Sequence, residues 1–257
     1  MSRFARLSKN GTLVYVELEG DTAHELSHAP WEGGTRIGKE HGWTEDDLRA
    51  PVRPGKVLCV GRNYAAHAKE LGNEVPKTPL LFLKPSSSVI GSGEAIVLPV
   101  ESTRVEHEAE LAVVIGKTAK NIRAEDAFAH VFGYTCGGDI TARDLQRSDG
   151  QWSRAKGFDT FCPLGPWIET KLDPSAISIR CAVNDQARQD GNTRDMVFQL
   201  PELIATMSRA MTLEPGDVLL TGTPEGVGPL VAGDVLTITI EGIGTLKCRV
   251  EPSQSSA

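Results

Sequence analysis

Residues Val105–Gly116 read Val-Glu-His-Glu-Ala-Glu-Leu-Ala-Val-Val-Ile-Gly, and this stretch decides the fold expected of the chain. Its second half is apolar at consecutive positions, which is typical of a strand buried on both faces. Side chains on a strand alternate between faces, so Glu108 and Glu110 point the same way, and Glu106 shares their parity. A solvated strand face is the ordinary alternative, but a carboxylate pair that enters a core is costly unless a cation binds it. The stretch predicts a metal site and leaves open which glutamates bind.

A third ligand candidate, Asp139, follows a pair of glycines that lets the backbone approach closely. If a helical turn starts there, Asp139, Arg143 and Gln146 share one face at i, i+4 and i+7. A metal ligand would then neighbour an anion-binding guanidinium and an amide. Two ordinary alternatives are that Asp139 is a helix N-cap, or that it forms a surface ion pair with Arg143.

A possible acid–base pair lies in a helix expected from Asn63 to about Leu71, with Asn63 as a possible N-cap and Gly72 as its stop. His67 and Glu70 are three residues apart and would be neighbours on this helix. A carboxylate beside an imidazole orients it and raises its basicity, as a general base for water requires. Because this spacing is common, an exposed surface pair is the alternative.

Two further segments could bind an anion. Lys156 lies in a segment rich in aromatic residues, where its ammonium group can be partly desolvated, although extension into solvent is the alternative. Residues 221–228 read Thr-Gly-Thr-Pro-Glu-Gly-Val-Gly and offer hydroxyls and free amides suited to a carboxylate. This loop lacks the Gly-Lys-Ser/Thr of a nucleotide-binding loop, so ATP is not expected.

Composition narrows the partners and the compartment. The 257 residues carry a net charge of -7 without a basic cluster, which argues against nucleic acid or an anionic membrane and favours a small substrate. No apolar run approaches the ~18 residues that span a bilayer, and the N-terminus lacks an apolar core for export, so a soluble cytoplasmic protein is expected. The five cysteines, never in Cys-x-x-Cys spacing, are expected to be buried reduced thiols.

The chain is expected to be mainly β with a few helices. Asn10-Gly11 predicts a tight hairpin, and the segment Pro51–Gly55 breaks any regular element. We therefore place a small N-terminal β-containing domain at 1–52 and a catalytic domain at 53–257. Within the second, residues 56–60 predict a buried strand, and the apolar spacing in 200–211 predicts a helix with Pro201 in its first turn.

Several motifs occur in order from about Pro54 to the end, roughly four fifths of the chain. They are Gly61-Arg-Asn-Tyr-x-x-His67, Glu108-x-Glu110-Leu, Asp139-Ile-Thr-Ala-Arg143-Asp-Leu-Gln146, Lys156-Gly-Phe-Asp-Thr-Phe-x-Pro-Leu-Gly-Pro and Thr221-Gly-Thr-Pro-x-Gly-Val-Gly. Together they resemble the fumarylacetoacetate hydrolase family, and its shorter acylpyruvase and oxaloacetate decarboxylase branch more than the longer founding enzyme. The first fifty residues carry little of the resemblance.

The resemblance implies a mixed β-sandwich roll and a homodimer. It also implies a Mg²⁺ or Mn²⁺ ion held by Glu108, Glu110 and Asp139. Glu106, which lies on the same strand face, would then not be a ligand.

The resemblance further assigns roles around that ion. His67 and Glu70 would form a dyad on a lid that orders over the substrate, and Lys156 would face the substrate. Three other positions match substrate contacts in relatives: Arg143, Gln146 and Thr223.

The resulting hypothesis is a metal-dependent hydrolase that cleaves the C–C bond of an acylpyruvate or another 2,4-dioxo acid. His67, oriented by Glu70, would activate water to attack the distal carbonyl, and a pyruvate enolate stabilised by the ion and Lys156 would depart. The same small 2-oxo acid site could instead serve an oxaloacetate decarboxylase or a 2-hydroxyhepta-2,4-diene-1,7-dioate or hydroxymuconate-type isomerase. A non-catalytic metal-binding β protein is the remote alternative.

Overall fold

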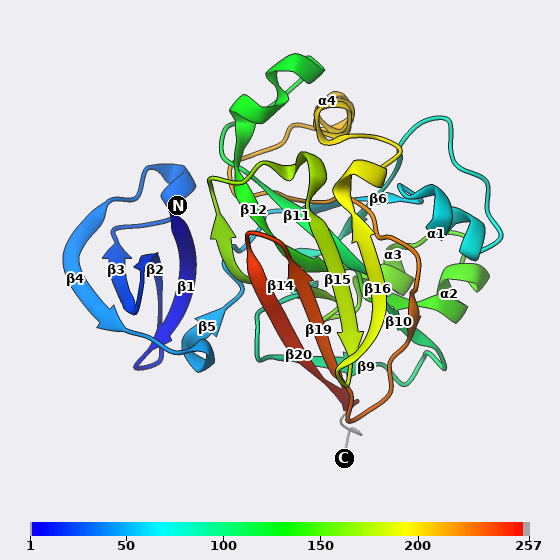
Figure 1. Cartoon of the computed structure of the whole chain (residues 1–257), viewed down its shortest axis with the longest axis horizontal. Helices are drawn as coiled ribbons and strands as arrows, with labels where there is room; N and C mark the ends of the chain where they lie inside the picture. Colours follow the sequence, from blue (N-terminus) through cyan, green and yellow to red (C-terminus); the bar gives the residue numbers. More distant parts are fainter. Residues whose placement is uncertain (1, 254–257) are drawn as a thin grey trace.

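The structure is a computed structural model that describes residues 2–253, and over this range the chain is mainly β, as predicted (Figure 1). Its largest sheet mixes antiparallel and parallel pairs. In order across the sheet, its strands are β4 (Arg36–Gly42), β3 (Thr22–Leu26), β2 (Thr12–Glu19), β1 (Arg3–Lys9), β14 (Cys162–Glu169), β12 (Val131–Gly138), β11 (Ala109–Ile115), β17 (Val218–Leu220), β6 (Val57–Gly61) and β7 (Leu80–Lys84). Two short strands pair at its sides: β5 (Leu48–Arg49) with β1 and β8 (Val89–Ile90) with β14.

Two smaller sheets complete the β structure. A five-stranded sheet has the order β16 (Gln186–Asn192), β15 (Ser178–Val183), β19 (Val235–Ile240), β20 (Gly244–Pro252) and β9 (Ala95–Leu98). A three-stranded sheet has the order β13 (Thr141–Ala142), β10 (Val105–His107) and β18 (Gly228–Pro229). The five-stranded sheet lies across β11 and β12 of the largest sheet, which gives the layered body of the molecule (Figure 1).

The helices are short and lie between the strands. The α-helices are α1 (Ala65–Glu70), α2 (Arg143–Ser148), α3 (Ser153–Gly157) and α4 (Leu200–Ala210). The 3₁₀ helices are η1 (Pro30–Glu32), η2 (Glu45–Asp47), η3 (Ser86–Ser88), η4 (Ala124–His130), η5 (Pro174–Ala176) and η6 (Thr193–Asp195). No helix within residues 2–253 is long and apolar enough to cross a membrane.

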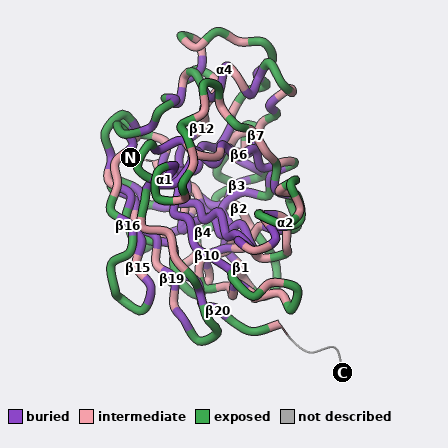
Figure 2. Tube along the Cα trace, turned by 90° about the vertical axis from the view of Figure 1, so that its right-hand side faces the viewer, coloured by how far each residue is buried: buried purple, intermediate pink, exposed green. Residues whose placement is uncertain are grey.

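Strand β11 runs through the middle of the core. Figure 2 shows that the buried residues gather in the centre of the molecule. Leu111 and Val113 pack into a cluster shared with the five-stranded sheet and α4, whereas Ala112 and Val114 pack into a second cluster on the other face. The strand is therefore buried on both faces, which explains its unbroken apolar sequence. The five cysteines are also buried and free.

The N-terminal strands form the predicted hairpin. Asn10 and Gly11 join β1 to β2 with φ values of 52° and 78°, which a tight primed turn requires. β1 also pairs with β14, where Arg3 lies opposite Glu169. The largest sheet thus continues from the N-terminal strands into the rest of the chain. The division between residues 52 and 53 stays a prediction.

Two predicted helices are present, but one differs in detail. Helix α4 begins with Pro201 in its first turn, as expected. Helix α1 is shorter than predicted, and Asn63 is not its N-cap. The Asn63 amide instead donates to the carbonyl oxygens of Phe198 and Thr221 and accepts from the Phe198 amide. These bonds tie the segment before α1 to two distant loops, a role that local sequence does not reveal.

Candidate active site

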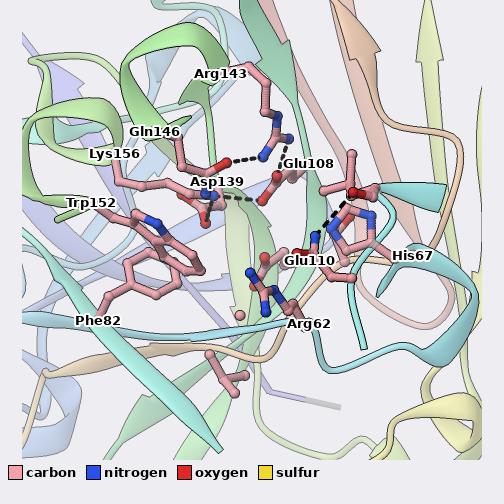
Figure 3. Close-up of a pocket in the computed structure, with 15 residues that line it drawn as sticks. Arg62, His67, Phe82, Glu108, Glu110, Asp139, Arg143, Gln146, Trp152 and Lys156 are labelled. Atoms are coloured by element: carbon pink, nitrogen blue, oxygen red, sulfur yellow. Dashed lines mark hydrogen bonds and ion pairs between the residues drawn. The ribbon is translucent and has the colours of Figure 1, made fainter. Parts of the chain in front are cut away.

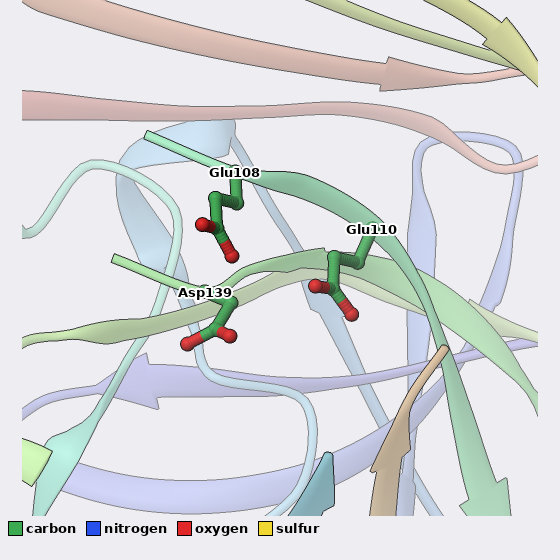
Figure 4. A group of neighbouring side chains, drawn as sticks. All are labelled: Glu108, Glu110 and Asp139. Atoms are coloured by element: carbon green, nitrogen blue, oxygen red, sulfur yellow. The ribbon is translucent and has the colours of Figure 1, made fainter. Parts of the chain in front are cut away.

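The acidic stretch crosses from one sheet to another at Glu108. Strand β10 belongs to the three-stranded sheet and β11 to the largest sheet, and Glu108 lies between them. Its carbonyl oxygen accepts the amide of Asp139 at 2.9 Å, so the two chain segments stay paired beyond β12. The carboxylates of Glu108, Glu110 and Asp139 face one another (Figure 4). One oxygen from each lies within 4.8 Å of the other two, and all three residues are buried.

Glu106 lies apart from this acidic cluster, although it shares the strand parity of the other glutamates. Its two carboxylate oxygens accept from Arg104 at 2.6 Å and from Arg143 at 2.7 Å. The cluster that the structure assembles is therefore the one that the resemblance implies.

Two buried lysines bind the acidic cluster. Lys156 Nζ donates to Glu108 at 2.8 Å and to Asp139 at 2.6 Å, so the alternative of an ammonium group in solvent is wrong. Lys84 Nζ donates to the other oxygen of Asp139 at 2.6 Å and to the carbonyl of Ile140 at 3.2 Å. Lys84 was not singled out from the sequence. The available signal was a lysine placed directly after the apolar run at 80–83.

The charges of the cluster shift its pKa values in opposite directions. Burial raises the pKa of Glu108, but Lys156 and Arg143 outweigh burial and lower it below its usual range. Burial and the charges of Asp139 and Glu108 raise the pKa of Glu110 well above its ordinary value. Burial alone would lower the pKa of Lys156, yet the adjoining carboxylates raise it and keep the ammonium group charged. The raised pKa of Glu110 means that the nearby cations do not compensate its negative charge. A hard divalent cation would compensate this charge and prefers oxygen ligands such as these.

Arg143 and Gln146 are neighbours, but Asp139 is not on their helix. Residues 141–142 pair with β10 as strand β13 before α2 begins, so the predicted helical turn from Asp139 is wrong. The alternatives of an N-cap and of a surface Asp139–Arg143 pair are also wrong, because lysines hold this carboxylate. Arg143 donates to Gln146 at 2.6 Å, and its other nitrogens donate to Glu106 and Glu108.

His67 faces the cavity from α1 and is not an exposed surface residue, since it is only 4% exposed. Its Nδ1 lies 3.4 Å from one oxygen of Glu70. The other oxygen of Glu70 accepts the amide of Gly226 at 3.0 Å, so the loop 221–228 holds the carboxylate. The pair is long, and its Glu70 side is partly open to solvent, because the Glu70 side chain is 33% exposed.

Thr223 lines the same cavity, but its hydroxyl already has two partners. It donates to the carbonyl of Ala109 at 2.8 Å and accepts from Gln189 at 2.7 Å. The Gln189 amide also donates to Pro224 and accepts from the amide of Ala109. Gln189 therefore ties β11 to the loop 221–228. No sequence signal identified it, since it lies in an ordinary polar strand.

The predicted site residues converge on one cavity (Figure 3). Of these residues only Glu70 does not line it, and Glu70 reaches it through His67. Arg62, Phe82 and Trp152 also line the cavity and were not singled out from the sequence. The arrangement combines oxygen ligands, fixed cations and an imidazole, which together can bind an anion and move a proton.

Comparisons with known proteins identify the family of the chain. The model of the fumarylacetoacetate (FAA) hydrolase C-terminal family matches residues 56–251. The human protein oxaloacetate tautomerase FAHD2A, mitochondrial, is 50% identical over 216 residues, which cover 79% of this chain and 69% of that protein.

Two solved structures are also similar. A 2-hydroxyhepta-2,4-diene-1,7-dioate isomerase from Mycobacterium marinum is 40% identical with a TM-score of 0.90, covering 99% of this chain and 100% of that one. A fumarylpyruvate hydrolase from Pseudomonas aeruginosa, in complex with Mn²⁺ and pyruvate, is 36% identical with a TM-score of 0.74, covering 81% and 93%. With its matched motifs, shared fold and convergent acidic cluster, the chain belongs to the fumarylacetoacetate hydrolase family.

Proposed function

We propose that this protein is a divalent-metal-dependent hydrolase that cleaves the C–C bond of an acylpyruvate or a related 2,4-dioxo acid. The observation that carries the proposal is that three buried carboxylates, a buried lysine and a histidine paired with Glu70 face one cavity. The relative in complex with Mn²⁺ and pyruvate supports both a divalent ion and a pyruvate product.

The acidic end of the cavity would bind the 2-oxo carboxylate of the substrate. Glu108, Glu110 and Asp139 would hold Mg²⁺ or Mn²⁺, which supplies positive charge to polarise the oxo acid. Lys156 lies against the same carboxylates and would donate a hydrogen bond to the oxygen of the developing enolate. Arg143 is fixed by its carboxylate partners and would add positive charge behind this end of the substrate.

The side of the cavity formed by His67 would supply the proton transfer. A hydrogen bond from Nδ1 of His67 to Glu70 leaves Nε2 to take a proton from water. The hydroxide equivalent attacks the distal carbonyl, the C–C bond breaks, and its electron pair moves into the enolate of pyruvate. Protonation of the enolate carbon then gives pyruvate beside a carboxylic acid. The His67–Glu70 pair, 3.4 Å apart, would tighten when α1 closes over substrate.

A second candidate function is tautomerisation, isomerisation or decarboxylation at the same site. These reactions pass through the same enolate and need a proton transfer or none, so they do not need an activated water. The names of the human tautomerase and of the Mycobacterium marinum isomerase favour this candidate. A homodimer is proposed on the resemblance alone.

The experiment is to assay the purified protein with acetylpyruvate, oxaloacetate and a hydroxymuconate-type diene acid, with and without Mg²⁺. Hydrolysis of acetylpyruvate that requires Mg²⁺ supports the first candidate, and turnover of the other substrates alone supports the second. His67→Ala should abolish acetylpyruvate cleavage and leave oxaloacetate decarboxylation. An equal loss of both would contradict the water-activating role. Metal binding without turnover of any oxo acid would favour a non-catalytic protein.

A further inference from the structure

Three cationic side chains line the cavity, and two of them are already paired. Lys156 binds Glu108 and Asp139, and Arg143 binds two glutamates and Gln146. Arg62 differs, because within residues 2–253 its side chain makes no hydrogen bond or ion pair. A guanidinium group that lines a cavity without a protein carboxylate keeps its full capacity to bind an anion.

The backbone of Arg62 is held in an unusual conformation. Its φ of 58° lies in the left-handed region, which residues other than glycine, asparagine and aspartate rarely adopt. The residue follows strand β6 and precedes Asn63, whose amide is bonded to Phe198 and Thr221. The surrounding loops, and not any preference of Arg62 itself, therefore impose this conformation and the direction in which its side chain leaves the chain.

The position of Arg62 suggests what it binds. In Figure 3 its side chain lies on the opposite side of the acidic cluster from Arg143 and Gln146. A substrate with its 2-oxo carboxylate on the cluster could therefore extend its far end toward Arg62. The pocket has charged groups for one carboxylate at the cluster and one unused cation for another.

We propose that Arg62 binds a second carboxylate at the far end of the substrate and so selects dicarboxylic oxo acids over monocarboxylic ones. This inference rests on the proposed function, because it assumes that the 2-oxo carboxylate binds at the acidic cluster. Arg62 is a specificity-determining residue in this account and takes no part in bond cleavage.

The test compares two ligands of equal carbon number that differ at the far end. The affinities of 2-oxoglutarate and 2-oxopentanoate for the Mg²⁺-loaded protein are measured by calorimetry, which does not require turnover. Wild-type protein should prefer 2-oxoglutarate by about tenfold or more, as a charge-assisted contact predicts. Arg62→Gln should remove this preference while binding 2-oxopentanoate within about twofold of wild type, and Arg62→Lys should keep part of it.

Control measurements separate the inference from the proposed function. Arg180→Gln, on β15 with a side chain that is 67% exposed, should leave the preference unchanged. Equal losses for both ligands in Arg62→Gln, or a preference that survives this substitution, would overturn the role of Arg62 and leave the proposed function intact. Failure of wild-type protein to bind either acid in the presence of Mg²⁺ would overturn the proposed function and this inference with it.

Discussion

The two ends of the cavity are built in different ways. The acidic floor, which consists of Glu108, Glu110 and Asp139 with Lys84 and Lys156, is buried, and its lysines bind Glu108 and Asp139 at 2.6 to 2.8 Å. The His67 wall, which is the helix α1, has a side-chain pair at 3.4 Å and a carboxylate that is 33% exposed. The floor is fixed before any substrate arrives, whereas the wall has room to adjust.

This difference matches the separate tasks that we propose. Charges act strongly where water is excluded and need no reorganisation when they are already in place. A general base must instead admit water and substrate, and its contacts tighten only in the loaded enzyme. A substitution in the floor should therefore weaken metal binding where it removes a proposed ligand. It should lower stability where it removes a buried ion pair. Substitutions in the wall should affect the rate alone.

Glu110→Gln should have the largest effect, because it removes a proposed ligand while leaving the fold intact. The glutamine can still accept the amide of Gly222, and its neutral amide resembles the protonated carboxyl that the raised pKa favours. We expect Mg²⁺ affinity and turnover to fall by about a thousandfold or more, with the unfolding temperature of metal-free protein unchanged or higher. Calorimetry measures the Mg²⁺ affinity, and thermal unfolding measures the stability.

Glu106→Gln is the matched control and should keep most of the affinity, because Glu106 lies outside the cluster. Equal losses in the two variants would contradict the ligand assignment.

Lys84→Met tests whether the floor is held by its buried lysine. Methionine keeps an apolar stem but leaves one oxygen of Asp139 and the carbonyl of Ile140 without their donor. We expect the free energy of unfolding to fall by about 3 kcal/mol in urea denaturation, the lower end for a broken buried pair, because Lys156 still neutralises Asp139. Lys39→Met removes an ammonium group that is 67% exposed and should cost less than about 1 kcal/mol. Similar losses in both variants would show that burial of Lys84 adds nothing.

Glu70→Gln tests the wall. The glutamine can still accept the amide of Gly226, but it presents an amide donor to Nδ1 of His67 and so favours the ring form with a proton on Nε2. We expect acetylpyruvate hydrolysis to fall by about tenfold to a hundredfold, with decarboxylation and stability nearly unchanged. Steady-state rates and thermal unfolding check this, and Lys69→Gln on the same helix is the control. A large loss of stability would show that the wall is as rigid as the floor.

Much of the floor was predictable because its signals are local. Apolar residues on both faces of β11 predicted a buried strand, and acidic residues at its entrance are unusual enough to indicate a cation. The Asn10-Gly11 hairpin and α4 were predicted for the same reason, since a turn or a helical face is encoded within a few residues.

The remaining features depend on contacts between residues that are distant in sequence. Lys84 is 55 positions from Asp139, and Gln189 is 34 positions from Thr223, so no local pattern connects them. The change of sheet at Glu108 and the strand before α2 are likewise set by partners elsewhere in the chain. These contacts explain why the helix expected from Asp139 does not form there.

The smallest effect is expected at Asp144, which anchors α2 and therefore Arg143 from outside the floor. Its carboxylate accepts from the hydroxyl of Ser102 at 2.6 Å and from the amide and hydroxyl of Thr103 at 2.8 and 2.9 Å. Burial would raise its pKa, but these hydrogen bonds outweigh burial and lower the pKa to about 2. Because the folded-state pKa lies below the unfolded value of 3.8, the stabilisation is present above that value and is lost as the pH falls through about 2.

Asp144→Asn should therefore lower the free energy of unfolding at neutral pH by about 1 kcal/mol, a figure reduced for partial exposure, and should flatten the acid side of the stability curve. Urea denaturation between pH 2 and pH 7 measures this, with Asp126→Asn in η4, whose side chain is 48% exposed, as the control. Stability curves with the same acid side in wild type and Asp144→Asn would contradict the lowered pKa of Asp144.

Because the bonds of Arg143 to Glu106 and Glu108 are independent of Asp144, the Mg²⁺ affinity of Asp144→Asn should stay within about twofold of wild type. A larger change would mean that the floor depends on the surface loop at 101–103, and the contrast between a self-contained floor and an adjustable wall would fail.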